Sequence, residues 1–363
     1  MSSQVITGTG YFQEKTKLLA QTIPRGAIAF ISHRDLDRTA AESLVQSGVK
    51  AVVNLECSMT GRFYHEGVFI LLHHQIALFD VTVPFKCPDV GPFFVSIAGQ
   101  HLYIKKGQSW EETACLLPWD LQRAEEKAAA SKEKEPDVFK TFMKNSLIHA
   151  AAGLDLFIES ISTLQPIDGV SGKQVFVVAR GAGYREDAAC WKQELRLPSS
   201  FVMAVDGASE GLLLEGIIPD VIIGDMDSLP EQAQSLNCIF VSHAYMNGKS
   251  PGHERLEKIG IRSEKRMFPG MSEDLAMMLA GVSGASKIYS IGCRSGYLEM
   301  MEKDREGMGS TLLTRAFLGH KISDLKLSGD LAVSAKLRQQ RRAALMHHDP
   351  LNDSSAEQRR QEQ

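Results

Sequence analysis

Residues 201–230, which read FVMAVDGASEGLLLEGIIPDVIIGDMDSLP, constrain the fold of this chain most, because they contain two apolar runs that each end in a carboxylate. The first run, 201–205, is typical of a strand buried on both faces of a parallel sheet, and it stops at Asp206. The second run, 221–223, stops at Gly224-Asp225. The segment between them, 208–216, is compatible with a helix. The stretch therefore predicts a strand, a crossover helix and a second, parallel strand.

Three carboxylates follow the ends of these two predicted strands. In open α/β sheets ligands bind outside the carboxyl ends of the strands, which is where Asp206, Asp225 and Asp227 fall. Carboxylates placed so close repel one another, and Mg²⁺ relieves this by binding one or two of them together with phosphate oxygens. Alternatively, each aspartate only caps a helix or forms a turn. The clustering favours metal ligands, with Ser228 beside them.

Three short motifs in this region resemble the catalytic-domain motifs of thiamine pyrophosphokinases: DGA at 206–208, PD at 219–220 and IGDMDS at 223–228. With VARG at 178–181 and the stretch 26–62, the chain to about Ser334 resembles the SteA-like proteins. These are bacterial proteins with a pyrophosphokinase-like domain that are associated with the cytokinetic ring. The resemblance implies an α/β fold with a Rossmann-like parallel sheet of the thiamine pyrophosphokinase type, preceded by a smaller α/β domain and a bridging helix.

The resemblance also implies a chemistry. Thiamine pyrophosphokinases transfer diphosphate from ATP to the thiamine hydroxyl with Mg²⁺ as cofactor, and they bind thiamine with a C-terminal β-sandwich. Too few strand-like runs follow Arg315 to build such a sandwich, which argues against thiamine as the acceptor. The expected acceptor is therefore an alcohol, thiamine or another. Two classes of function stay open. One is a pyrophosphokinase-type transferase, and the other is a nucleotide-binding cell-division or envelope protein of SteA type with slow or no turnover.

Further candidate contacts to the nucleotide lie at strand ends and helix starts. Arg180 and Gly181 follow the buried run 174–179 in a glycine turn that would present N–H groups to phosphate, which a guanidinium can also grip bidentately. Ser272 and Asp274 open a helix, where capping alone would explain them. The resemblance implies instead that Asp274 is catalytic with Asp225 and Asp227. The predicted nucleotide-binding set is Arg180, Gly181, Asp206, Gly207, Ser228, Lys249, Arg255, Ser272, Gly309, Ser310 and Thr311.

Some members of this set are supported by weaker sequence evidence. Lys249 and Arg255 match a stretch that lies near the nucleotide crevice in the family, and a solvated loop explains them equally well. Gly309, Ser310 and Thr311 form a glycine-hinged helix start that could present N–H groups to an anion. In the N-terminal part, the 58–62 segment SMTGR loosely matches a SteA-like stretch and offers Arg62 to a second ligand. His33 is explained more simply by a helix start than by phosphate acceptance.

Composition and periodicity divide the chain into four segments. Residues 1–120 form a small α/β domain, with buried strands at 26–31 and 49–55, a helix at 35–47, and hairpins or short strands over 69–83 and 92–105. Residues 121–168 form a linker and a long bridging helix that restarts at Pro136. Residues 169–336 form the nucleotide-binding domain, and 337–363 form a disordered tail. The lead-in 1–23 is polar, with a short helix at 12–22.

Charge and cysteine content limit the partners and the compartment. A net charge of −4 argues against bulk nucleic-acid binding. Six cysteines without a CxxC pair indicate neither a zinc site nor a disulfide framework. No signal layout and no apolar window of about 18 residues occur, so we expect a cytoplasmic protein, with recruitment to the division septum implied by the resemblance. The expected partners are a nucleotide, a small alcohol acceptor, a membrane or septal protein, and a second copy in a homodimer.

Overall fold

The computed structural model describes residues 5–83, 87 and 92–326. The predicted disordered tail, 337–363, lies outside these residues. The described residues form two compact units: one comprises those up to Leu154 together with Arg294–Leu312, and the other comprises Asp155–Cys293 and those from Leu313 to Lys326. Within the described ranges, no helix is both long and apolar enough to span a membrane.

The first unit is built on a closed barrel of seven strands in the order β1-β2-β3-β4-β7-β6-β5. Strands β1 to β4 pair in parallel, and the remaining pairs are antiparallel. The strands are β1 (Ile6–Phe12), β2 (Ile28–Ile31), β3 (Ala51–Asn54), β4 (Ala77–Val81), β5 (Phe93–Ala98), β6 (His101–Lys106) and β7 (Ser109–Pro118). The strand-helix-strand start was predicted, but closure of a barrel through β1 and β5 was not.

Helices α1 (Thr16–Thr22), α2 (Arg38–Ser47) and α3 (Gly67–His73) pack on this barrel. Two local predictions were wrong here. Residues 6–12 form strand β1 instead of a polar lead-in, and 69–73, predicted as part of hairpins or short strands, belong to helix α3. A short apolar run such as VFILL does not distinguish a helix from a strand by periodicity alone, because all its positions are apolar.

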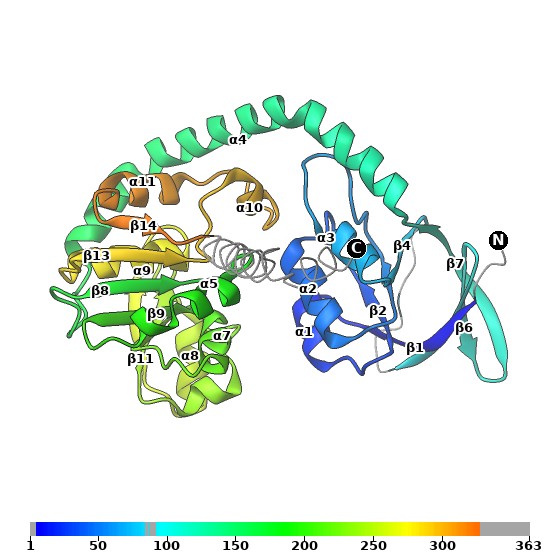
Figure 1. Cartoon of the computed structure of the whole chain (residues 1–363), viewed down its shortest axis with the longest axis horizontal. Helices are drawn as coiled ribbons and strands as arrows, with labels where there is room; N and C mark the ends of the chain where they lie inside the picture. Colours follow the sequence, from blue (N-terminus) through cyan, green and yellow to red (C-terminus); the bar gives the residue numbers. More distant parts are fainter. Residues whose placement is uncertain (1–4, 84–86, 88–91, 327–363) are drawn as a thin grey trace, which may run out of the picture. The chain divides into compact units, whose positions relative to one another are not determined.

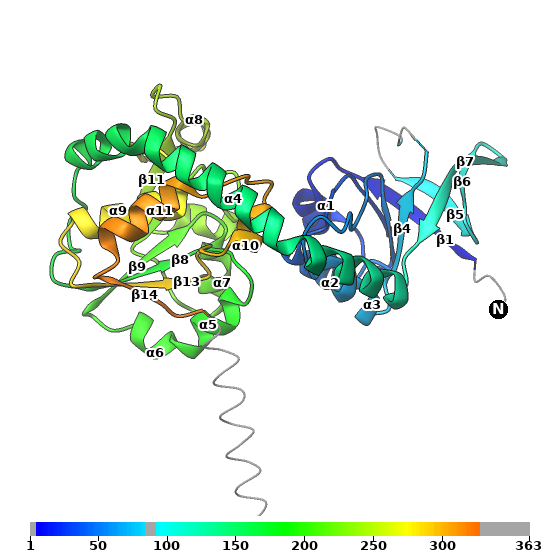
Figure 2. The same ribbon diagram turned by 90° about the horizontal axis from the view of Figure 1, so that it is seen from above.

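A single long helix, α4 (Leu121–Thr163), follows the barrel and runs into the second unit (Figure 1, Figure 2). Pro136 lies inside it, so the predicted restart at that residue was wrong: the helix continues through the proline although one backbone hydrogen bond is lost there. Its beginning packs through Ala124 and Ala128 on the first unit. Its end contributes Phe157 to the core of the second unit, and the two units divide within this helix, after Leu154.

The second unit is a seven-stranded sheet in the order β12-β11-β10-β9-β8-β13-β14 with every pair parallel. Figure 1 shows several of these strands side by side. The strands are β8 (Gln174–Val178), β9 (Ser200–Val205), β10 (Val221–Gly224), β11 (Ile239–Ala244), β12 (Glu264–Met267), β13 (Lys287–Ile291) and β14 (Ile322–Asp324). The predicted parallel sheet is therefore confirmed.

Helices cover both faces of this sheet. One core contains alternate strand residues such as Val177 and Ile223, packed against α9 and the end of α4. The other contains Phe176 and Ile222, packed against α5, α7 and α8. The remaining elements are α5 (Tyr184–Cys190), α6 (Lys192–Leu195), α7 (Ala208–Leu214), the 3₁₀ helix η1 (Glu231–Ser235), α8 (Pro251–Lys258), α9 (Ser272–Val282), α10 (Tyr297–Met301) and α11 (Gly309–Leu318).

The strand order contains a point where the direction of winding reverses. The chain passes from β8 outward through β9, β10, β11 and β12, then returns to β13 on the opposite side of β8. The connections that leave β8 and β13 therefore diverge, and ligands bind outside the carboxyl ends of strands at such a point. A Cβ at Gly181, just after β8, would lie 2.3 Å from the carbonyl oxygen of Gly292, just after β13. Only glycine permits this close approach.

Candidate functional site

The core of the candidate site is a contact between the ends of β9 and β10. Asp206 follows β9, and its carboxylate accepts hydrogen bonds from the backbone N–H groups of Met226 at 2.8 Å and Asp225 at 3.3 Å. A Cβ at Gly224 would lie 2.1 Å from Asp206 Oδ2. Glycine at this position therefore makes room for the carboxylate. The two apolar runs that the sequence singled out are joined at their carboxyl ends by this aspartate.

Electrostatic repulsion accompanies this arrangement. Burial, and then the charge of Asp225, raise the pKa of Asp206 to about 7, with a smaller contribution from Asp227. The hydrogen bonds from the two backbone N–H groups act in the opposite direction and offset only part of this. Asp225 and Asp227 are exposed. The structure therefore places Asp206 against residues 224–228, here called the acidic turn, which carry Asp225 and Asp227, and a cation there would relieve the repulsion.

The donor set fits a hard divalent cation, because carboxylates are the ligands that Mg²⁺ takes from proteins. Across the part of the chain that the structure describes, the three carboxylates do not form a group whose oxygens all lie within 4.8 Å of one another. Mg²⁺ needs only one or two carboxylates and completes its shell with water and phosphate oxygens. Asp225 and Asp227, being exposed, are the ones that would hold it.

Polar groups lie next to the acidic turn. The Ser228 hydroxyl donates to Asp227 Oδ1 at 2.7 Å. A Cβ at Gly207 would lie 3.1 Å from Arg180 Nη1 and 3.2 Å from Ser228 Cβ, which places the Arg180 guanidinium beside these two residues. The structure thus brings together Arg180, Gly207, Asp227 and Ser228, four residues that the sequence predicted separately.

Helix α8 contacts the backbone of the acidic turn. Arg255 Nη1 donates to the Met226 carbonyl oxygen at 2.6 Å, and Gly252 packs so closely that a Cβ there would lie 2.4 Å from the Asp225 carbonyl oxygen. The Arg255 side chain therefore contacts the backbone of the acidic turn. Lys249 is exposed in a turn where its N–H donates to Asn247 Oδ1 at 3.0 Å, and its phosphate contact stays a prediction.

His243, near the end of β11, is a residue that the sequence analysis did not propose for the site. Its Nε2 lies 2.8 Å from the Phe268 carbonyl oxygen and its Nδ1 lies 3.1 Å from Ser272 Oγ. Because a carbonyl can only accept, Nε2 carries the proton and Nδ1 accepts from the Ser272 hydroxyl. Burial lowers the pKa of His243, against the nearby charges of Asp225 and Asp274. A polar side chain near the end of a buried strand, one position after Ser242, which pairs with Gly224, was the available signal.

Asp274 is buried in the first turn of α9, where its Oδ2 accepts from the Met271 N–H at 3.2 Å. This is the helix-capping arrangement that the sequence left open as an alternative. Its charge, like that of Asp225, acts on His243 and raises the pKa of that imidazole against the effect of burial. Gly309, Ser310 and Thr311 open α11 and fall in the first unit. Their phosphate contacts stay a prediction.

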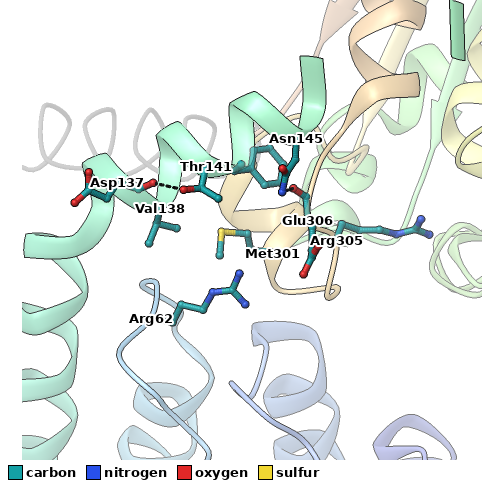
Figure 3. A pocket seen from close by; sticks show the side chains of 9 residues that line it. Arg62, Asp137, Val138, Thr141, Asn145, Met301, Arg305 and Glu306 are labelled. Atoms are coloured by element: carbon teal, nitrogen blue, oxygen red, sulfur yellow. Dashed lines mark hydrogen bonds between the residues drawn. The ribbon is translucent and has the colours of Figure 1, made fainter. Parts of the chain in front are cut away.

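The first unit has a cavity of its own, with a volume of about 400 Å³. Figure 3 shows Arg62 reaching from its loop toward Met301 of α10, while Thr141 and Asn145 of α4 form another wall. A smaller neighbouring hollow is lined by Arg34 and Asp35 as well as Arg62. The predicted second ligand at Arg62 therefore has a concave surface available to it.

Comparison with known proteins gives limited similarity. No protein-family model matches the chain. A 6-hydroxymethyl-7,8-dihydropterin pyrophosphokinase from Methanocaldococcus jannaschii is 29% identical over 113 residues, which is 29% of this chain and 46% of that protein. The chain thus matches about half the length of this curated relative. The similarity to a pyrophosphokinase is distant, and nothing in the comparisons points to a SteA-like identity.

Two solved structures are also similar. The thiamin pyrophosphokinase from Geobacillus thermodenitrificans is 17% identical, with a TM-score of 0.27, over 42% of this chain and 58% of that one. The thiamine pyrophosphokinase from Bacillus subtilis is 20% identical, with a TM-score of 0.27, over 42% of this chain and 60% of that one. The chain's own helices and sheets make it a mixed α/β protein, and its sequence similarity to a pyrophosphokinase is distant.

Proposed function

We propose that the second unit binds a magnesium–ATP complex at the carboxyl edge of its sheet and transfers the diphosphate to an alcohol. The observation that carries this proposal is the acidic turn, in which Asp225 and Asp227 lie beside Asp206 and help raise its pKa to about 7. The distant similarity to a pyrophosphokinase supports the reaction class. The acceptor is an alcohol, either thiamine, a hydroxymethyl compound of the kind named for the relative, or another.

In the proposed reaction the acceptor oxygen forms a bond to the β-phosphorus of ATP. The bond between that phosphorus and the oxygen bridging to the α-phosphate breaks, AMP leaves with the bridging oxygen, and the hydroxyl proton passes to solvent or to a carboxylate. Such a reaction depends mainly on positioning and on charge stabilisation. When bound, Mg²⁺ would neutralise phosphate charge.

Several residues of the chain would bind the phosphates or position the site. Arg180, beside Gly207 and Ser228, would bind phosphate oxygens as a bidentate donor. Arg255 holds the acidic turn through the Met226 carbonyl. Neutral His243 accepts a hydrogen bond from the Ser272 hydroxyl, which ties the start of α9 to the end of β11. The resemblance to thiamine pyrophosphokinases implies that Asp274 would orient the acceptor hydroxyl. Its bond to the Met271 N–H gives it the additional role of fixing this helix start.

The first test measures Mg²⁺-dependent ATP binding by calorimetry for the wild type, Asp225→Asn and the control Asp168→Asn. Asp168 is exposed and lies outside the acidic turn. We expect Asp225→Asn to weaken Mg²⁺-ATP binding by about tenfold or more, which is at least ~1.4 kcal/mol, while the melting temperature without ligand is unchanged or raised. An unaltered affinity in Asp225→Asn would refute the metal assignment.

The second test measures AMP formation from ATP across a panel of alcohols that includes thiamine and hydroxymethylated pterins. Acceptor-dependent AMP formation is expected. Tight Mg²⁺-ATP binding without AMP from any acceptor would instead favour a nucleotide-sensing protein that acts through a membrane or septal partner. The two measurements thus separate the binding site from the reaction.

A further inference from the structure

Three side chains of metal-binding type lie together on the β6–β7 strand pair of the first unit. His101 begins β6, and Glu112 and Cys115 belong to β7. His101 Nδ1 lies 2.7 Å from Glu112 Oε1, and each residue offers a ligand atom within 4.8 Å of those of the other two. All three side chains are exposed. An imidazole, a carboxylate and a thiol therefore reach the same point on the barrel surface.

A β-bulge brings these residues to one face. His101 pairs with Cys115 and Leu102 with Ala114, but the register then shifts so that Tyr103 pairs with Glu112. Successive side chains of a regular strand alternate between faces, so Glu112 and Cys115, three positions apart, would point in opposite directions. The extra residue in the bulge reverses this alternation and turns Glu112 toward Cys115. Bulges commonly redirect a side chain in this way.

The backbone that carries the three groups is held firmly. Strand β7 pairs with β6 on one side and with β4 on the other within the closed barrel. The Cys115 carbonyl oxygen accepts hydrogen bonds from both the N–H and the hydroxyl of Thr82, each at 3.0 Å. Ligands on paired strands are placed more accurately than ligands on loops. Only side-chain rotations are then needed to complete a coordination geometry.

We propose that His101, Glu112 and Cys115 form a binding site for a transition-metal ion, Zn²⁺ in the first instance, with water in the fourth position. One nitrogen, one oxygen and one sulfur ligand suit Zn²⁺, whose bonds of about 2.0–2.3 Å place tetrahedral ligand atoms roughly 3.3–3.7 Å apart. The His101–Glu112 pair opens slightly to reach this spacing, and Cys115 closes toward it. The thiolate and carboxylate charges balance those of the ion.

This site is chemically different from the one proposed for Mg²⁺. A hard cation selects oxygen ligands and accepts no thiolate, so the acidic turn and the β6–β7 site would take different metals. The spacing of the six cysteines could not reveal the second site, because a single cysteine joins a histidine and a glutamate across two strands. The bulge that aligns them has no sequence signature that we could read.

The test uses Co²⁺ titration of the metal-free full-length protein, because cobalt bound to a thiolate gives a charge-transfer absorption that cobalt on oxygen ligands lacks. We expect one equivalent of Co²⁺ to produce this absorption and Zn²⁺ to displace it. Cys115→Ser should abolish the band, whereas Cys190→Ser, which alters another exposed cysteine, should leave it intact. His101→Ala should weaken binding by more than about tenfold, since loss of even an outer-shell partner costs that much.

Three results would overturn the proposal: no saturable thiolate band, a band that survives in Cys115→Ser, or equal affinity in His101→Ala and Cys190→Ser. Because the three side chains are exposed, the variants should keep the wild-type melting temperature without metal. If Cys115→Ser has a lowered melting temperature, Glu112→Gln tests the site instead, because this variant leaves the thiol in place. That variant should retain the thiolate band but require more than about tenfold more Co²⁺ for saturation, and unchanged saturation would also overturn the assignment.

Discussion

Replacing Asp206 by asparagine should change how the stability of the protein depends on pH. The pKa of Asp206 rises from 3.8 to about 7 on folding, chiefly through burial and then through the charge of Asp225. Between these two pH values the folded state binds a proton that the unfolded state releases. The contribution of Asp206 to folding stability is therefore highest below about pH 4, falls as the pH rises, and is lowest above about pH 7.

The size of this effect follows from the same pKa. A rise from 3.8 to about 7 corresponds to at most ~4 kcal/mol. Because Asp206 is partly exposed, solvent screening reduces the expected effect to about 2–3 kcal/mol. The amide that replaces the carboxylate keeps an acceptor for the Met226 N–H and carries no charge. Asp206→Asn should match the wild type at about pH 4 and exceed its stability by about 2–3 kcal/mol at about pH 8, or roughly 4–12 °C in melting temperature.

Differential scanning calorimetry between about pH 4 and pH 8, with chelator and without nucleotide, measures this difference. The control is Asp168→Asn, which removes an exposed carboxylate and should follow the wild type at every pH. Saturating Mg²⁺ should narrow the gap at the alkaline end, because the cation relieves the same repulsion in the wild type. Parallel curves for Asp206→Asn and the wild type over the whole range would refute the reasoning, as would a variant that is less stable at the alkaline end.

Two further predictions concern packing. Gly181→Ala would place a Cβ 2.3 Å from the Gly292 carbonyl oxygen, so it should lower the stability of the second unit by about 1–3 kcal/mol. The control is Gly153→Ala in α4, where a Cβ meets no neighbouring atom within 4 Å and the melting temperature should be unchanged or raised. Equal melting temperatures in the two variants would contradict the close approach of Gly181 to Gly292. Phe157→Ala, which removes a buried ring 5.5 Å from that of Phe268, should cost about 3–5 kcal/mol in chemical denaturation. Its exposed neighbour Ile158→Ala should cost less than about 0.5 kcal/mol, and similar losses in the two would show that the end of α4 is not part of the core.

The centre of the parallel sheet could be predicted because the strands there are short, continuous apolar runs. The runs 174–179, 201–205 and 221–223 correspond to β8, β9 and β10. The carboxylates could be placed at one edge for the same reason, since parallel strands present their carboxyl ends together. The sequence alone could therefore predict that Asp206, Asp225 and Asp227 lie close together, but not the distances between their carboxylates.

The remainder depends on contacts between distant segments. Closure of the barrel requires β1 to pair with β5, which lies far along the chain, and local pattern does not specify such a pair. His243 belongs to the site because Phe268 and Ser272 approach it from another loop. The helix passes through Pro136 because Ala128 before the proline and Phe142 after it are both buried, and this packing outweighs the local preference of proline to end a helix.

The outermost strands of the second sheet bear on how the protein behaves at high concentration. Unpaired edge strands offer backbone groups to which another chain can add, and long apolar edges lead to aggregation. The edge strand β12 has only four residues, Glu264–Met267, with charged side chains along it and an ion pair between Arg266 and Glu264. At the other edge, β14 spans only Ile322–Asp324. Short and charged edges of this kind disfavour growth of the described sheet from one molecule into the next.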